Sequence, residues 1–177
     1  VYLTPLLGGY IADKFWGNRR SILVGGILMA IGQFLLFMSG SAVTEGIQSP
    51  SAMSFMWGGL TLLIIGNGFF KPNISTMVGQ LYTKSDSRVD GAFTIFYMGI
   101  NMGAFFSPLI CGTLAQPLGG TIHDFRWGFL AAAIGMVVST ISFELLKNKH
   151  LKDPDGLAIG MPKAKMDVKT YGVILGT

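Results

Sequence analysis

Lys71 is a single charged residue within a long apolar segment. No other charged residue occurs between Met53 and Thr83. The segment is long enough to cross a bilayer, which requires about 20 apolar residues. Because a lysine near the centre of such a helix costs roughly 2.5–3.5 kcal/mol, we expect its side chain to face a cavity or a partner and to be functional. The alternative is a side chain that extends to the interface near Tyr82, but that helix end is roughly 16 Å away.

Two other polar residues lie at a similar depth in separate apolar segments. Counted from the charged end of each segment, Lys71, Asn101 and Tyr2 are all roughly 15–17 Å deep at 1.5 Å per residue. This depth is about half of a ~30 Å hydrocarbon core. Binding sites of secondary transporters lie at that level. The three residues therefore predict a solute site near the middle of the membrane.

The segment around Asn101 has two distinct faces. Tyr97 and Asn101 are four residues apart and share one side of a helix. Gly99, Gly103 and Ser107 lie on roughly the opposite side and form a stripe of small residues, on which a neighbouring helix can pack closely. This arrangement leaves Tyr97 and Asn101 free to face a cavity. An interhelical hydrogen bond made by Asn101 is the alternative.

Two prolines interrupt the same segments. Pro72 directly follows Lys71, and Pro108 follows Asn101 by about two turns. Each proline removes one backbone hydrogen bond, which frees a carbonyl oxygen and lets the helix bend. Membrane helices tolerate such a bend where neighbours or cavity water satisfy the freed group. A bend that assists alternating access and a static kink that assists packing are both consistent with this pattern.

The composition indicates a membrane protein with several spans. Half of the residues are hydrophobic and only 12% are charged, whereas soluble domains contain about 25% charged residues. The net charge of +4 is distributed over helix ends and one tail, so it does not indicate nucleic-acid binding. The sequence contains no metal-ligand spacing and no nucleophile–base pair, so we expect neither an enzyme nor a cofactor.

Five apolar segments predict an all-α architecture. The predicted helices are about 1–12, 21–38, 53–82, 91–116 and 127–146, the first too short to span a membrane. Residues 147–168 read as a linker that could also contact anionic lipid, and 169–177 as the start of a further helix. Near the end of the fifth segment, Glu144 is spaced to pair with Lys147. We expect the chain to be an internal piece of a longer protein.

Positive charge predicts the orientation of these helices. Lysines and arginines follow the first, third and fifth segments, and the other two connections contain only Arg126. Cytoplasmic connections carry an excess of such residues, so the connections after these three segments are expected in the cytoplasm. The first of them contains Asp13, Arg19 and Arg20, where a carboxylate beside two guanidiniums can lock helix ends together.

This turn resembles the loop motif of major facilitator transporters, which steadies the outward-facing state at the cytoplasmic side. The residues that match the motif are Gly9, Asp13, Lys14, Gly17, Arg19 and Arg20. Three further stretches resemble signatures of the proton-dependent oligopeptide transporter family. They are YLTPLLGG (residues 2–9), FFKPNIS (residues 69–75) and FYMGINMGAFFSP (residues 96–108).

The resemblance implies helices two to six of the amino-terminal six-helix bundle of a major facilitator fold, in a multi-pass protein of the cell membrane. It implies symport of di- and tripeptides with protons, in which Lys71 binds peptide and couples protons. Asn101 would contact the peptide backbone, and Tyr97 and Tyr2 would line the pocket. A second, carboxyl-terminal bundle would complete the site. Transport of another anionic solute such as nitrate, and a non-transporting sensor on the same fold, are the alternatives.

Overall fold

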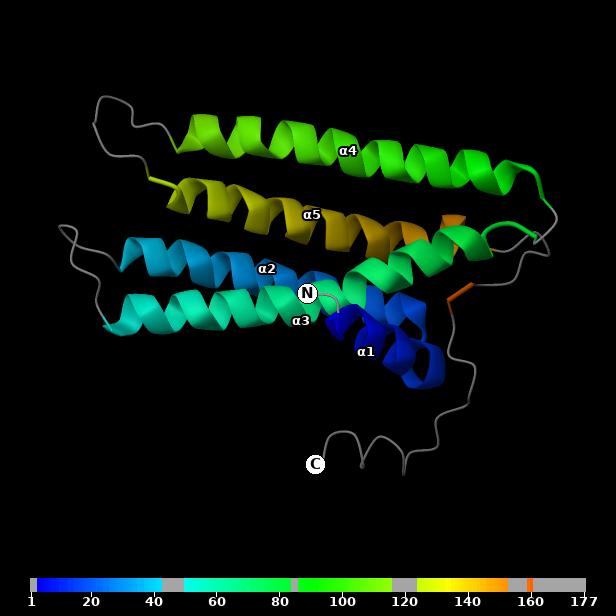
Figure 1. The fold of residues 1–177 in the computed structure, drawn as a ribbon, viewed down its shortest axis with the longest axis horizontal. Helices are drawn as coiled ribbons and strands as arrows, with labels where there is room; N and C mark the ends of the chain where they lie inside the picture. Colours follow the sequence, from blue (N-terminus) through cyan, green and yellow to red (C-terminus); the bar gives the residue numbers. More distant parts are fainter. Residues whose placement is uncertain (1–2, 43–49, 84–85, 116–123, 153–158, 161–177) are drawn as a thin grey trace.

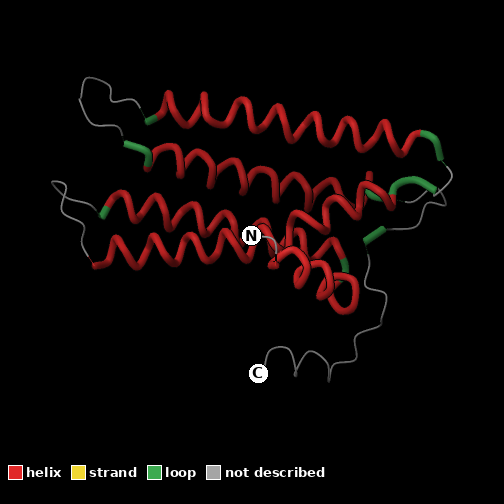
Figure 2. Tube along the Cα trace, in the orientation of Figure 1, coloured by secondary structure: helices red, strands yellow, loops and turns green. Residues whose placement is uncertain are grey.

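The computed structural model describes residues 3–42, 50–83, 86–115, 124–152 and 159–160 of the chain. It contains α1 (Leu3–Ile11), a π-helical turn η1 (Ala12–Trp16), α2 (Asn18–Ser41), α3 (Pro50–Gln80), α4 (Arg88–Leu114) and α5 (Arg126–His150). Figures 1 and 2 show the four long helices running side by side, with the short α1 near one end. Each long helix is apolar and long enough to cross a membrane. The prediction of an all-α membrane protein is confirmed.

Some helices extend further than the apolar runs predict. α2 begins at Asn18 and includes both arginines of the charged turn, and α5 continues to His150. Arginine and lysine are good helix formers, so a helix can continue past the point at which its sequence stops being apolar. The first residues of the predicted linker therefore belong to α5. Tyr2, most of the remaining linker and the predicted further helix (169–177) lie outside the described residues.

Close backbone contact between α2 and α3 forms the centre of the fold. A Cβ atom placed on Gly25 would lie 2.7 Å from the carbonyl oxygen of Gly66, and one on Gly59 would lie 2.8 Å from that of Gly32. Only glycine allows helices to approach this closely, and such packing drives helix association in membranes. The many glycines of the sequence thus bring α2 and α3 together.

The short helix α1 contacts the second half of α3. A Cβ atom on Gly8 would lie 2.2 Å from the carbonyl oxygen of Gly68. About two turns further along the chain, the Trp16 ring stacks on Phe69 with 5.6 Å between ring centroids. The chain then reverses at Gly17, whose φ of 76° is a left-handed conformation that suits glycine. These contacts hold the charged turn against the helix that carries Lys71.

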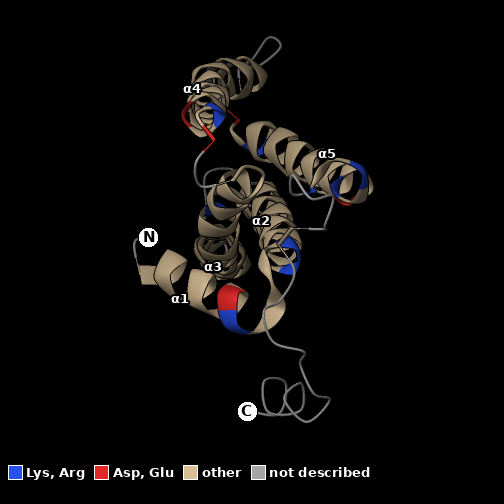
Figure 3. Cartoon of the chain, turned by 90° about the vertical axis from the view of Figure 1, so that its right-hand side faces the viewer, with Lys and Arg blue, Asp and Glu red and all other residues tan. Residues whose placement is uncertain are grey.

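α4 is the most open of the long helices. It lies beside α5, touches α3 at few points, and none of its residues is buried. No described atom comes within 4 Å of a Cβ atom placed on Gly99 or Gly103. The small-residue stripe therefore has no partner among the described residues, and its role as a packing surface stays a prediction. Figure 3 views the molecule from the end where η1, the start of α2 and the end of α5 carry their charged residues.

Candidate functional site

Lys71 lies in the second half of α3, a helix of 31 residues. Its side chain is exposed, and no hydrogen bond or ion pair involves its ammonium among the described residues. The next residue, Pro72, is inside the helix, and α3 changes direction in this half (Figure 1). The structure thus places an unneutralised cation beside a bend, in a helix that can span a membrane. Such a group is suited to binding an anionic solute.

Asn73 is a feature of this bend that the sequence analysis did not single out. Its side chain is only 1% exposed, and its Nδ2 donates a hydrogen bond of 2.6 Å to the carbonyl oxygen of Phe69. Pro72 has no N–H to offer the carbonyl oxygen of Gly68, and the Asn73 side chain donates to the next carbonyl oxygen along, that of Phe69. The sequence feature that could have indicated this contact is an amide residue directly after a proline in an apolar run.

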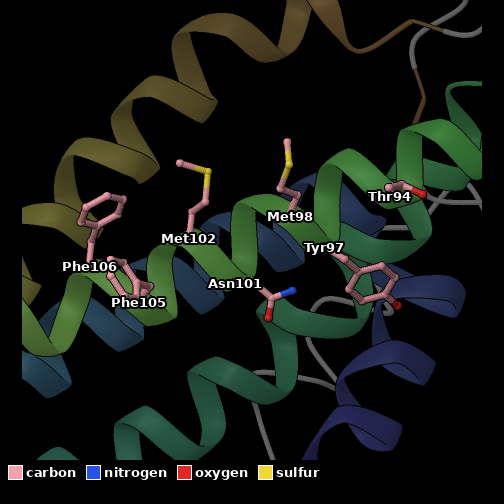
Figure 4. Close-up of a pocket in the computed structure, with 7 residues that line it drawn as sticks. All are labelled: Thr94, Tyr97, Met98, Asn101, Met102, Phe105 and Phe106. Carbon is pink, nitrogen blue, oxygen red and sulfur yellow. The ribbon is translucent and has the colours of Figure 1, made fainter.

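An open cavity of about 840 Å³ lies along α4. Its lining residues are Thr94, Tyr97, Met98, Asn101, Met102, Phe105 and Phe106. In Figure 4, Tyr97 and Asn101 project from one side of α4, where α3 passes, whereas Met98 and Met102 project from the side of α5. An amide and a phenol within an apolar, thioether-rich surface can orient a small solute by a few hydrogen bonds.

The predicted binding residues therefore lie on two helices that barely touch. None of the described hydrogen bonds joins Lys71 to Asn101 or Tyr97, and Lys71 does not line the cavity on α4. A solute that used both groups would have to bridge α3 and α4. Tyr2, the fourth predicted binding residue, lies outside the described residues.

The side chain of Arg19, in the charged turn, makes its described hydrogen bonds with the end of α5. Asp13 is exposed on η1, while Arg19 is buried and 6% exposed. The Arg19 guanidinium donates to Asn148 Oδ1 at 3.1 Å and to the carbonyl oxygens of Lys147 and Leu151. Arg19 thus joins α2 to the end of α5, and its described contacts do not include Asp13.

Three ion pairs occur at helix ends among the described residues. The Lys147 ammonium lies 2.5 Å from a Glu144 carboxylate oxygen, which confirms the predicted pair. At the start of α4, the guanidinium of Arg88 donates to the carboxylate of Asp86 and lowers the pKa of that carboxyl. Arg126 pairs with Asp124 at the start of α5. Among the described residues, no group of three or more His, Cys, Asp or Glu could hold a metal ion.

Comparison with known proteins identifies the fold and its family. A family model described as the POT family matches residues 19–156, which is most of the chain. The chain belongs to the POT family. The match includes Lys71, Asn101 and Tyr97, and the three long helices that follow α2.

The similar proteins of this family are transporters. The chain is 40% identical over 151 residues to the uncharacterized transporter YclF of Bacillus subtilis, covering 85% of the chain and 27% of that protein. It is 39% identical over 170 residues to a di-/tripeptide transporter of Lactococcus lactis subsp. cremoris, covering 96% of the chain and 30% of the relative. The chain thus spans less than a third of the length of these relatives.

Solved structures show the same fold. A POT family transporter in complex with a thioalcohol-conjugated peptide matches with a TM-score of 0.74 at 36% identity, over 99% of this chain and 32% of that one. The peptide transporter POT in complex with sulfate matches with a TM-score of 0.74 at 32% identity, over 99% of this chain and 32% of that one. The chain therefore has the fold of the corresponding third of these POT transporters.

Proposed function

We propose that the complete protein containing this chain carries di- and tripeptides together with protons across the cell membrane by alternating access. The observation that carries the proposal is Lys71, an exposed cation without a neutralising partner among the described residues, in a helix that can span the membrane. A relative of known substrate class, the di-/tripeptide transporter of Lactococcus lactis subsp. cremoris, supports peptide as the solute.

The proposed binding mode follows from the chemistry of a peptide. The carboxylate of a dipeptide accepts hydrogen bonds from the Lys71 ammonium, and charge-assisted bonds of this kind are strong in a desolvated site. The Asn101 side chain both donates and accepts, so it matches a backbone amide. Tyr97 and Tyr2 would line the pocket, and Lys71 would exchange its proton as the peptide binds and leaves. The solute would bridge α3 and α4.

The remaining parts of the mechanism are assigned to the helix ends and bends. Bending at Pro72 and Pro108 would let α3 and α4 change shape around the site. The turn with Gly9, Asp13, Arg19 and Arg20 would close the cytoplasmic side, because the connections rich in positive charge are expected there. A second bundle of the same protein would cover the open face of α4 and complete the site.

A second candidate is transport of another small anion. One matched structure of the peptide transporter POT is in complex with sulfate, and a fixed lysine would suit an inorganic anion as well as a carboxylate. A non-transporting sensor on the same fold would bind peptide but not move it. Substrate competition distinguishes the first alternative, and measured flux distinguishes the second.

The test is uptake of labelled dialanine into liposomes that contain the complete, folded protein. With an inward proton gradient, dialanine is expected to accumulate above its external concentration, and a protonophore is expected to abolish the accumulation. Competition by unlabelled dipeptide but not by nitrate or sulfate would favour peptide over another anion. Folded protein that moves no dialanine under the gradient would reject the proposal.

A further inference from the structure

Two residues beyond α5 fold back onto the bundle. The peptide N–H of Ile159 donates to the carbonyl oxygen of Leu151, which directly follows α5, at 3.4 Å. The Ile159 side chain is only 7% exposed and packs in a cluster with Ile22 of α2 and Met77 of α3. This contact thereby joins α2 and α3 to the residue that follows α5.

Gly160 extends this contact through its backbone. Its carbonyl oxygen accepts a hydrogen bond of 3.2 Å from the N–H of Arg19, and its own N–H donates to Oε1 of Gln80 at 3.1 Å. The N–H of Arg19 lies in the first turn of α2, where backbone donors have no partner within the helix. Gly17, the residue before α2, offers no side-chain cap. Gly160 therefore caps α2 from a remote part of the chain.

The side chain of Arg19 contacts the end of α5, while its backbone N–H contacts Gly160. Its guanidinium donates to the carbonyl oxygens of Lys147 and Leu151 at the end of α5, which also accept hydrogen bonds from the N–H groups of Leu151 and Ile159, respectively. A cation at this position is also stabilised by the negative end of the helix dipole. The Arg19 side chain thus joins the start of α2 to the end of α5, and Gly160 accepts from the N–H of the same residue.

The residue at position 160 has to be glycine for this geometry. Its φ of 73° is left-handed, a conformation that residues with a side chain rarely adopt. A Cβ atom at this position would lie 3.1 Å from Cγ of Arg19 and 3.3 Å from Sδ of Met77. Any side chain would therefore strain the backbone and press on two buried neighbours.

We propose that residues 159–160 form a strap that docks on the ends of α2, α3 and α5 and holds these three ends together. The ends held by the strap belong to the helix that carries Lys71 and to the helix that follows the charged turn. The strap would hold these helix ends together whatever solute the protein carries. Its contact with them can therefore be measured without a transport assay.

The test measures how fast a maleimide labels single cysteines in a cysteine-free background of the complete protein, in which Cys111 is also replaced. Ile159→Cys is expected to react at least about tenfold more slowly than Lys152→Cys, because Ile159 is buried and Lys152 is exposed. Labelling of Ile159→Cys at the same rate as Lys152→Cys, in protein that still unfolds cooperatively, would overturn the proposal.

Two matched pairs of variants identify what holds the strap. Adding Gly160→Ala to Ile159→Cys is expected to remove most of the protection, whereas Gly135→Ala should leave it, because nothing described lies within 4 Å of a Cβ atom there. Gln80→Ala, which removes the acceptor for Gly160, should increase the labelling rate severalfold, and Gln80→Glu, which keeps an acceptor, should not. Protection that survives both Gly160→Ala and Gln80→Ala would overturn the proposed contacts.

Discussion

Arg19 and Leu151 are separated by 132 residues in the sequence, yet a hydrogen bond of 2.5 Å joins the guanidinium of one to the carbonyl oxygen of the other. The same guanidinium also binds Asn148 Oδ1 and the carbonyl oxygen of Lys147. Only a planar group with several N–H donors can reach all three acceptors at once. The contact explains why a charged residue of the sequence motif is buried.

Replacement of Arg19 by lysine is expected to destabilise the protein although it keeps the charge. A single ammonium cannot replace the guanidinium at three acceptors, and the loss of one or two charge-assisted hydrogen bonds would cost about 2–4 kcal/mol. Thermal unfolding followed by tryptophan fluorescence would measure the loss. The control is Arg88→Lys, because Arg88 is 78% exposed and should tolerate the change. Equal unfolding temperatures for the two variants would contradict the assigned role of Arg19.

Two adjacent glycines of α1 provide a matched test of its contact with α3. A Cβ atom on Gly8 would lie 2.2 Å from the carbonyl oxygen of Gly68, whereas one on Gly9 would lie 3.8 Å from Cβ of Pro72. Gly8→Ala should therefore force α1 away from α3 and cost about 1–3 kcal/mol. Gly9→Ala should cost much less, because its contact distance is ordinary. The unfolding temperatures of the two variants provide the comparison. A lower unfolding temperature for Gly9→Ala than for Gly8→Ala would be inconsistent with the fold.

Removal of the Asn101 amide is expected to weaken peptide binding more than it weakens folding. Loss of one or two hydrogen bonds to a bound peptide would raise the KM of dialanine uptake roughly 5- to 30-fold. Ser107→Ala is the control on the same helix, since Ser107 lies on the side of the small-residue stripe. A similar KM for Asn101→Ala and the unaltered protein would remove Asn101 from the proposed site.

The sequence was sufficient to predict the long helices and to predict that Lys71 lies within one of them. Apolar runs separated by charged turns predict four spans, and each corresponds to a long helix. The predicted helix ends fall before the observed ends where a helix continues through charged residues, as in α5. The reason is that hydropathy decreases along the sequence before helix propensity does. The pair Glu144–Lys147 was predictable because its partners are neighbours on one helix turn.

The contacts between distant segments could not be predicted in the same way. Nothing in the local pattern indicates that Arg19 binds the end of α5 or that Gly160 caps α2, because these partners are brought together only by helix packing. The left-handed conformation of Gly160 and the burial of Asn73 also follow from the tertiary structure. The proposed site is only partly predictable in this way. Its residues were chosen from their depth along the helices, whereas the solute that would bridge them is a proposal.

The most direct test of the proposed site is proton-driven dialanine uptake by the Lys71→Ala variant of the complete protein. We expect uptake to fall at least tenfold, since the variant lacks the cation that binds the peptide carboxylate in a poorly solvated site; this corresponds to about 1.4 kcal/mol or more. Lys152→Ala, which changes an exposed lysine beyond α5, should transport normally. Gradient-driven accumulation by folded Lys71→Ala protein at the rate of the unaltered protein would contradict the account.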